Sequence, residues 1–436
     1  MSNDEAVLEA AEAFLRDEVG PKAQEIDRAP EVLRWALRGL CERNLMALRR
    51  PAEYGGPGIG EEAFRHFQEA CARYSGALSF LQTQHQSAGS MIAKSPNAAL
   101  REAYLPAMGN GERLVGIGFS QLRRGGPPIM RASLADGGYV LDGHVPWVTG
   151  FGFYPEFLVG ATLPDGRAVF AVVPLHSTPQ PPSSFSRDPS SENLQGGRRE
   201  ENEEGGFRNS FSRDPGAGTG QGGRREENEE GGFRNSFSRN RGAGTGQGGR
   251  REENEEGGSQ IRISEPMRLA AMETANTVTV DFSGFFVPDE KVCFIREAGW
   301  IKNNDQINIA LQGHFALGCA RAGLDILAAA AEKKNLDFAR SAFEALSREL
   351  SECREQTRLA QKGVELEETT QERLQVRAWA IDLAVRCAHA AVAASGGAAN
   401  SIHHPAQRVY REALVYTVSA QTTPIMEATL ARLVRG

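Results

Sequence analysis

The sequence predicts an α+β multidomain protein in which a helical region, a β region and a second helical region follow one another. Two observations support this prediction. Apolar residues recur every three or four positions near both ends of the chain, whereas the middle contains short runs separated by glycine, aspartate and proline. We therefore expect an N-terminal all-α domain at 1–112, a middle antiparallel β-barrel or sandwich at 113–292, and a C-terminal α bundle at 293–436.

The N-terminal domain is expected to be helical up to about Gly111, because helical patterns there are broken only by short polar or proline-containing links. One of these links is PAEYGGPG, which begins at Pro51. The expected helices are Glu5 to Glu18, Pro30 to Met46, Gly60 to Tyr74, Ala77 to Lys94 and Ala98 to Met108.

The middle domain is expected to contain strands in VGIGFS, GYVLDG, FLVGAT, AVFAVV and NTVTVDF. In the last of these, Val278, Val280 and Phe282 alternate with polar residues, which is typical of a strand with one buried face. The C-terminal domain begins with apolar residues from Ile307 to Ile326 at steps of three and four, which places them on one helix face. Further helices are expected at Ala339 to Ala360, Glu372 to Ala394, His404 to Tyr416 and Pro424 to Arg435.

A repetitive segment interrupts the middle domain. GGRREENEEGG begins at Gly196, Gly222 and Gly248, and residues 183–258 hold 18 of the 48 glycines but only eight apolar residues. Because such a segment cannot build a core, we expect a disordered insertion without which its flanking strands would join through a short turn. A functional interaction tail is the alternative.

Composition excludes several classes of protein. The net charge of −7 and the lack of a basic stripe argue against nucleic-acid binding. The six scattered cysteines show neither CxxC pairs nor zinc-ligand spacing, so we expect reduced thiols and no metal site. His403 and His404 are adjacent and are interpreted as a surface cap, and His85 as a packed helix residue or a pocket residue. The acidic N-terminus and the absence of a long apolar run favour a cytoplasmic protein without a membrane partner.

Six strings in this order resemble the acyl-CoA dehydrogenase family over nearly the whole chain, the insertion excepted. They are PAEYGGPGIG (51–60), YLPAMGNGE (104–112), GYVLDGHVPWVTG (138–150), FFVPDEKV (285–292), ASGGAANS (394–401) and VYREALVYTVSAQTTPI (409–425). The resemblance implies a C-terminal four-helix bundle, FAD as cofactor, an acyl-CoA or other small-molecule substrate, and a homo-oligomer, either a dimer or a tetramer. It also implies oxidation of a CH–CH bond in an acyl thioester, as in fatty acid metabolism.

The resemblance assigns residues to the flavin. Ser120 takes the place of the family's flavin-facing threonine, Trp147 and Thr149 match its WxT motif, and Thr422 matches the threonine of its closing motif. A buried barrel aromatic is the alternative for Trp147. The neighbouring Arg123 and Arg124 are either phosphate partners or solvated loop charges.

A second group is expected to hold the pyrophosphate and adenine of FAD together with a neighbouring subunit. Gly396 and Gly397 match the family's paired glycines, which let the backbone approach a phosphate, and Lys333 replaces an arginine. The alternative for the glycines is a simple helix end.

The catalytic residue cannot be assigned from the resemblance. Ala420 occupies the position of the family's usual glutamate base, Asn308 lies near the alternative position, and Glu427 is expected on a solvated helix face. Because alanine cannot accept a proton, two other functions remain open, namely a flavin monooxygenase-type reaction and a non-catalytic scaffold that retains the fold.

Overall fold

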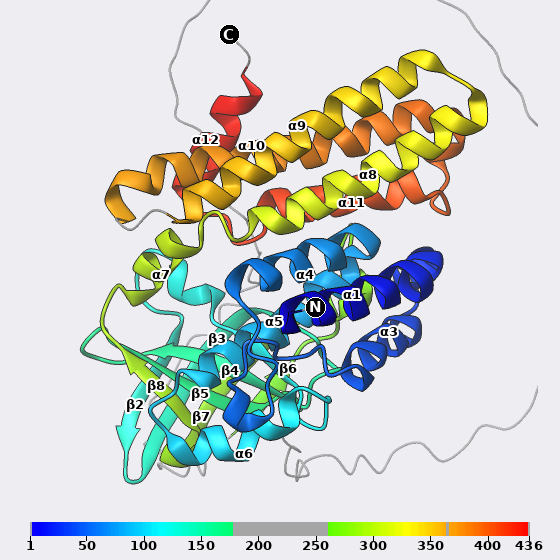
Figure 1. The fold of residues 1–436 in the computed structure, drawn as a ribbon. Coiled ribbons are helices and arrows are strands. Elements are labelled where there is room, and N and C mark those ends of the chain that lie inside the picture. The colour runs from blue at the N-terminus through cyan, green and yellow to red at the C-terminus, as the bar shows by residue number, and fades with distance from the viewer. Residues whose placement is uncertain (1, 178–259, 363–365, 435–436) are drawn as a thin grey trace, which may run out of the picture. The chain divides into compact units, whose positions relative to one another are not determined.

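The computed structural model describes residues 2–177, 260–362 and 366–434, which are coloured in Figure 1. All of them belong to one unit. Helices come first along the chain, then the strands of one sheet, then helices again, as the sequence predicts. The expected insertion at 183–258 lies outside the described residues.

The N-terminal helices start at the polar residues that cap them. Ser2 accepts a hydrogen bond from the Glu5 N–H, and the Glu5 carboxylate accepts one from the Ser2 N–H, which starts the first helix. Ser75 and Asn97 accept backbone bonds at the starts of the fifth and sixth helices. The helices are α1 (Asn3–Phe14), α2 (Ala23–Ile26), α3 (Pro30–Glu42), α4 (Glu61–Tyr74), α5 (Gly76–Ala93) and α6 (Ala98–Met108).

One N-terminal helix differs from its predicted form. The sequence predicts regular helix from Glu5 to Glu18, but α1 ends at Phe14 and a π-helical turn, η1 (Leu15–Val19), follows. A π turn contains more residues than an α turn, so residues five positions apart, such as the buried Phe14 and Val19, come closer to the same side. Leu15 and Val19 are both fully buried, and the turn directs both into the core.

The strands form a single sheet in the order β6-β7-β3-β2-β4-β5-β8, with β1 paired to β4. Pairing is antiparallel except for β1 with β4 and one residue pair between β2 and β4, so the sheet is mixed at this point rather than wholly antiparallel as expected. The strands are β1 (Val115–Gly118), β2 (Met130–Ala135), β3 (Gly138–Thr149), β4 (Glu156–Thr162), β5 (Ala168–Pro174), β6 (Gln260–Ile263), β7 (Thr277–Pro288) and β8 (Val292–Arg296).

The strands on either side of the repetitive segment are not neighbours in the sheet. β5 pairs with β4 and β8, whereas β6 pairs with β7 at the other end of the strand order. The two strands therefore do not form a hairpin, and a short turn that joins them in the absence of the segment stays a prediction. Alternation of apolar residues identifies a strand but carries no information about its partner.

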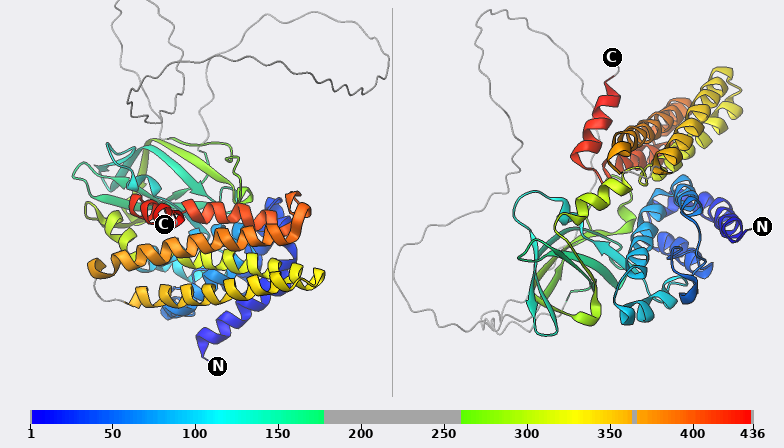
Figure 2. Two further views of the ribbon diagram at one scale, coloured as in Figure 1. Left: turned by 90° about the horizontal axis from the view of Figure 1, so that it is seen from above. Right: turned by 60° about the vertical axis from the view of Figure 1, so that its left-hand side comes forward.

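The C-terminal helices α8 to α11 run side by side, as both views of Figure 2 show. The helix α8 packs against α4, α9, α10 and α11. A Cβ at Gly318 of α8 would lie 2.2 Å from the backbone oxygen of Glu69 in α4, so only glycine permits this approach. The helices are α7 (Trp300–Asn308), α8 (Gly313–Lys334), α9 (Asp337–Lys362), α10 (Leu366–Ser395), α11 (Pro405–Val418) and α12 (Thr423–Leu433).

The first C-terminal helix is interrupted where the sequence predicts continuity. Ile307 was expected on the same face as the apolar residues of α8, but it lies on α7 and is 51% exposed. The spacing of apolar residues does not predict that the helix is interrupted between Asn308 and Gly313. The stretch Trp300–Lys334 is long and apolar enough to span a membrane, but it contains this break and 67% of its apolar window is buried within the protein.

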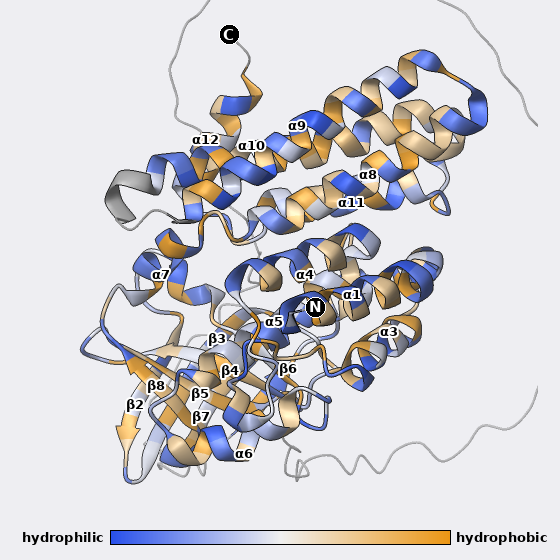
Figure 3. Ribbon diagram, in the orientation of Figure 1, coloured by the Kyte–Doolittle hydropathy of each residue, from blue (hydrophilic) through white to orange (hydrophobic). Residues whose placement is uncertain are grey.

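The strands consist largely of apolar residues, whereas the helices are amphipathic, with an apolar and a polar face (Figure 3). Buried residues from the N-terminal helices, the sheet and α8 to α11 form one large cluster. The described parts of all three regions thus share a core, and this fixes the cavity between them.

Candidate active-site cavity

A cavity of about 980 Å³ lies where the three regions meet. One wall comes from α4 and α5, and a second from the sheet, from the 3-10 turn η4 (Ser120–Arg123) and from α7. The start of α8, the end of α11 and the start of α12 close the remaining side. Its size falls in the range of cofactor and substrate sites.

Aromatic side chains dominate the wall formed by the sheet and α7. Phe294 and Trp300 lie with ring centroids 6.1 Å apart, and Phe119 and Phe315 also line the cavity. Trp147 projects from β3 and is 40% exposed, which excludes the alternative of a buried barrel aromatic. The pairing of β3 with β7 shifts register between Val145 and Val148, a stretch that contains Pro146, which lacks an N–H.

Three of the predicted flavin residues line this cavity, and one does not. Ser120, Trp147 and Thr422 are part of the lining. Thr149 is 1% exposed, and its hydroxyl is 3.0 Å from that of Thr277, its partner across β7. The structure thus places the Thr149 hydroxyl inside the sheet.

The other predicted cofactor residues lie together at the far ends of α8 and α10, outside the lining of the cavity. Lys333 is exposed in the last turn of α8, and the next residue, Lys334, donates a 2.6 Å hydrogen bond to the Ala394 carbonyl. Gly396 directly follows α10 with a φ of +72°, so it also serves as a helix end. A Cβ at Gly397 would meet nothing within 4 Å, so its backbone is accessible.

None of the positions considered for the base supplies a carboxylate to the cavity. Ala420 lines it with a φ of +48°, a conformation that is unusual for alanine. Asn308 also lines it and donates a 2.7 Å hydrogen bond to the Asn304 carbonyl. Glu427 is exposed and is not part of the lining.

An ion pair inside the cavity was missed by the sequence reasoning. Asp305 of α7 is the single carboxylate among the described lining residues. Arg123 of η4 donates two hydrogen bonds to it, of 2.6 and 2.7 Å, and the Asp305 side chain is 17% exposed. Arg123 is therefore neither a solvated loop charge nor unpaired. No motif marks the pair, because its members are 182 positions apart.

Cations otherwise outnumber acids in the lining. Besides Arg123, the positive side chains are Arg49, Arg65, Lys94, Arg124 and Arg296. The Nε atoms of Arg65 and Arg296 are buried without a hydrogen-bond partner among the described residues. An environment with this charge balance favours an anionic ligand.

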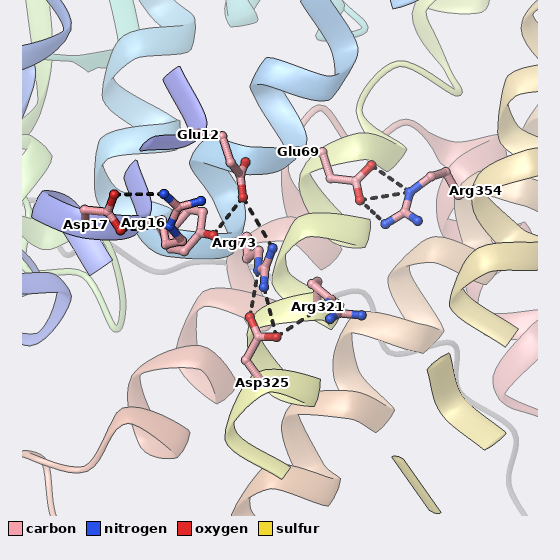
Figure 4. Close-up of polar contacts among 9 residues, drawn as sticks. Glu12, Arg16, Asp17, Glu69, Arg73, Arg321, Asp325 and Arg354 are labelled. Carbon is pink, nitrogen blue, oxygen red and sulfur yellow. Dashed lines mark hydrogen bonds and ion pairs between the residues drawn. The ribbon is translucent and has the colours of Figure 1, made fainter. Parts of the chain in front are cut away.

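A second, more open hollow of about 670 Å³ lies between α1, α4, α8 and α9. Charged side chains at this hollow contact one another, as Figure 4 shows. Arg73 contacts both Glu12 and Asp325, and Asp325 also contacts Arg321. Arg354 binds Glu69 through both Nε and a terminal nitrogen. Burial alone would raise the pKa of Glu69, but the adjacent His314 and Arg354 outweigh burial and hold that pKa below its ordinary value.

The remaining histidines considered in the sequence are structural. His85 is fully buried, its Nδ1 accepts the Val115 N–H at 3.0 Å and its Nε2 lies 3.0 Å from the Met108 carbonyl oxygen, and burial lowers its pKa to about 4. The His404 side chain accepts the Ala406 N–H at the start of α11 and thus caps that helix.

Comparison with known proteins gives matches in sequence and in fold. Residues 2–112 match the family model "Acyl-CoA dehydrogenase, N-terminal domain". Mitochondrial isovaleryl-CoA dehydrogenase of Arabidopsis thaliana is 30% identical over 149 residues, which cover 32% of this chain and 36% of that protein. A 3-(aryl)acrylate reductase of Clostridium sporogenes is 23% identical over 201 residues, 45% of this chain and 51% of the reductase. The chain thus spans about a third to a half of the length of these relatives.

Solved structures match over the full chain. Butyryl-CoA dehydrogenase of Megasphaera elsdenii superposes with a TM-score of 0.68 at 15% identity and covers 100% of this chain and 99% of its own. A glutaryl-coenzyme A dehydrogenase in complex with glutaryl-CoA superposes with a TM-score of 0.68 at 15% identity. The match covers 100% of this chain and 96% of the dehydrogenase. KijD3 in complex with dTDP superposes with a TM-score of 0.64 at 15% identity. The match covers 100% of this chain and 97% of KijD3. These structural similarities show that the chain has the same fold as these proteins.

Proposed function

We propose that the chain is a member of the acyl-CoA dehydrogenase family and an FAD-dependent oxidoreductase acting on an acyl thioester, which the match of residues 2–112 to the family's N-terminal domain supports. One observation carries the proposal. A cavity of about 980 Å³ brings together Ser120 and Trp147 of the middle region and Thr422 of the C-terminal region, in a lining rich in aromatic rings and cations. A planar ring with attached phosphates is the chemistry that such a lining accommodates.

The residues of the cavity fit FAD. Trp147 and Phe294 offer flat apolar surfaces for the ring system, and the Ser120 hydroxyl offers a hydrogen bond to its polar edge. Arg124 and Arg296 supply positive charge for phosphate oxygens. When bound, FAD would supply the acceptor for the hydride that leaves the β-carbon of the thioester.

A second copy of the chain completes the dinucleotide site in this proposal. Lys333, Gly396 and Gly397 lie outside the cavity of their own chain and are exposed, and Lys334, next to Lys333, reaches the end of α10 just before Gly396. An exposed lysine beside bare glycine backbone suits a phosphate or an adenine of a neighbour's FAD. The protein is therefore proposed to be a homo-oligomer.

Asp305 is proposed as the proton acceptor. Ala420 has no acceptor atom, whereas the Asp305 carboxylate lies in the cavity and is held by the two hydrogen bonds from Arg123. Each carboxylate oxygen accepts one of these bonds, which fixes the carboxylate, and each oxygen keeps a further lone pair that can accept the α-proton. Arg123 acts here as a positioning residue.

An oxygen-using, monooxygenase-type reaction is the second candidate. The observation that favours it is the alanine at position 420, since such a reaction needs no base there. The two candidates differ in what the substrate does to bound FAD in the absence of oxygen. Only in a dehydrogenase is the bound FAD reduced by the thioester alone.

The test is anaerobic mixing of FAD-loaded protein with short acyl-CoA thioesters, monocarboxylic and dicarboxylic, while flavin absorbance is followed. We expect the wild type to be reduced and Asp305→Asn to be slower by roughly 10²- to 10⁴-fold. Ala420→Glu in the Asp305→Asn background should recover part of the rate, because it restores a carboxylate to the lining.

Asp281→Asn is the matched control, because Asp281 pairs with His144 on the exposed face of the sheet. Unchanged reduction in Asp305→Asn would remove Asp305 from the mechanism. If FAD binds but no thioester reduces it in any variant, dehydrogenation is wrong and the oxygen-using reaction takes its place.

A further inference from the structure

The cavity wall formed by α4 and α5 is polar. Thr83, Ser87, Ser90 and Lys94 follow one another at steps of four, three and four, so one face of α5 presents hydroxyls and an ammonium group to the cavity. Gln68 and Gln84 also belong to this lining. An aliphatic acyl chain placed here would cover hydroxyl and amide groups without bonding them, which is unfavourable.

One amide of this wall lacks a partner. Gln68 of α4 is 4% exposed, and its Oε1 accepts a 2.6 Å hydrogen bond from the Gln82 Nε2. Its own Nε2 is buried and donates to no described residue. A buried donor without an acceptor is costly, so a ligand oxygen at this wall would be favoured.

Two arginines next to this amide share one carboxylate. Arg65 lies one turn before Gln68 on α4 and contacts Glu61 Oε1 at 3.2 Å, while Arg49 contacts Oε2 of the same glutamate. Both arginines line the cavity. Burial lowers the pKa of Arg65 to about 10, and burial together with the charge of Arg65 lowers that of Arg49. The charge of Glu62 also acts on Arg65 and opposes the effect of burial on its pKa. Glu61 is thus shared by two guanidinium groups, and no carboxylate among the described lining residues contacts either of them.

The arginine pair is held in place by the surrounding fold. The N–H of Leu48 donates to the Gln86 Oε1 at 2.8 Å, and the Gln86 Nε2 donates to the Leu45 carbonyl at 2.8 Å. These bonds fix the segment that carries Arg49 against α5. The Arg49 guanidinium also lies over the Phe64 ring, 4.8 Å from its centroid.

We propose that Arg49 and Arg65 bind a carboxylate at the distal end of the substrate's acyl group. The substrate would then be a short, polar acyl thioester with a second negative charge, rather than a plain aliphatic one. This inference rests on the proposed function, because it assumes that the reacting thioester lies in the same cavity. The carboxylate would place a second negative charge against the two guanidinium groups from the cavity side, and the unpartnered Gln68 Nε2 is a further donor in the same lining.

The experiment compares two thioesters of equal chain length, glutaryl-CoA and valeryl-CoA, which differ only by the terminal carboxylate. Binding to the full-length FAD-loaded protein is measured by titration calorimetry in the Asp305→Asn background, in which the proposed reduction of FAD by the thioester is slow, and the arginine variants are made in the same background. We expect glutaryl-CoA to bind roughly tenfold to a hundredfold more tightly, as for a charge-assisted hydrogen-bonded pair. Arg49→Gln and Arg65→Gln should bring this ratio close to one while leaving the affinity for valeryl-CoA nearly unchanged.

Arg38→Gln, at an exposed arginine of α3 outside the cavity, is the matched control and should keep the wild-type ratio. Equal affinities for the two thioesters, or an equal loss of both in Arg65→Gln, would overturn the inference but leave the proposed function intact. If neither thioester binds, the proposed function fails. Free glutarate then tests the subsite alone, and glutarate binding that is absent, or unaffected by Arg65→Gln, would also overturn the inference.

Discussion

The two hollows of this protein differ in how their charges are balanced. Between α1, α4, α8 and α9, three acids of the lining, Glu9, Glu12 and Glu69, accompany three arginines, Arg73, Arg321 and Arg354, and the adjacent Asp325 pairs with two of these arginines. In the cavity between the sheet and the helices, six cationic side chains of the described lining accompany the single carboxylate of Asp305. Balanced charges join elements of the fold, whereas a surplus of one sign leaves interactions to be made with a ligand.

The charged side chains of the hollow between α1, α4, α8 and α9 differ from one another in how far they are buried. The Arg73 and Asp325 side chains are 29% and 36% exposed, so their pair contributes little, but Glu69 is only 11% exposed and connects α4 to Arg354 of α9. We conclude that Glu69 is the member of this hollow that stabilises the fold. The cavity residues should instead affect ligand binding more than stability.

The largest expected effect is on stability, in Glu69→Gln. The substitution removes the charge that compensates Arg354, and we expect a loss of about 2 to 3 kcal/mol in the free energy of unfolding, with FAD affinity unchanged. Chemical denaturation measures the first quantity and FAD titration the second. Glu18→Gln, whose pair with Arg43 is 46% exposed at the glutamate, should change stability by about 0.5 kcal/mol or less.

The pH dependence of this loss has a definite sign. The pKa of Glu69 is held below its ordinary value of 4.5 in the folded protein, so its contribution is complete above that pH and is lost as the pH falls through the lower folded value. The stability difference between wild type and Glu69→Gln should therefore be full at pH 7 and shrink below about pH 4.5. A difference that stayed constant into the acid range would contradict the role assigned to Glu69.

Trp147→Ala should have a smaller energetic effect, and on a different property. Because Trp147 is 40% exposed, its removal should cost little stability but weaken FAD binding by roughly tenfold to a hundredfold through the loss of ring contact. Equilibrium dialysis against FAD and thermal unfolding of the apoprotein separate the two. A protein destabilised without any change in FAD affinity would show that Trp147 belongs to the core and not to the site.

Much of the fold was predictable because it depends on local pattern. α6 has the predicted bounds of Ala98 to Met108, and the alternation in NTVTVDF corresponds to the buried Val278 and Val280 of β7. By contrast, β2, β6 and β8 were not predicted. β6 spans only four residues and includes the exposed Arg262, so its apolar pattern is too short to register.

The site was predictable only where a motif carries it. Ser120, Trp147 and Thr422 were identified by resemblance, and the fold brings them to one cavity. Thr149 belongs to the same motif as Trp147, but its pairing opposite Thr277 in β7 places its hydroxyl inside the sheet. The ion pair of Asp305 with Arg123, like the sharing of Glu61 by two arginines, depends on which helix faces which, and that is decided by tertiary packing.

The central claim, that the cavity between the sheet and the C-terminal helices holds FAD, is tested most directly by the absorbance spectrum of the purified wild-type protein, before and after denaturation. The account predicts a flavin spectrum, with roughly stoichiometric FAD released on denaturation, or taken up again when FAD is added to the apoprotein. A colourless protein that binds no added FAD would contradict the claim and leave a scaffold that retains only the fold.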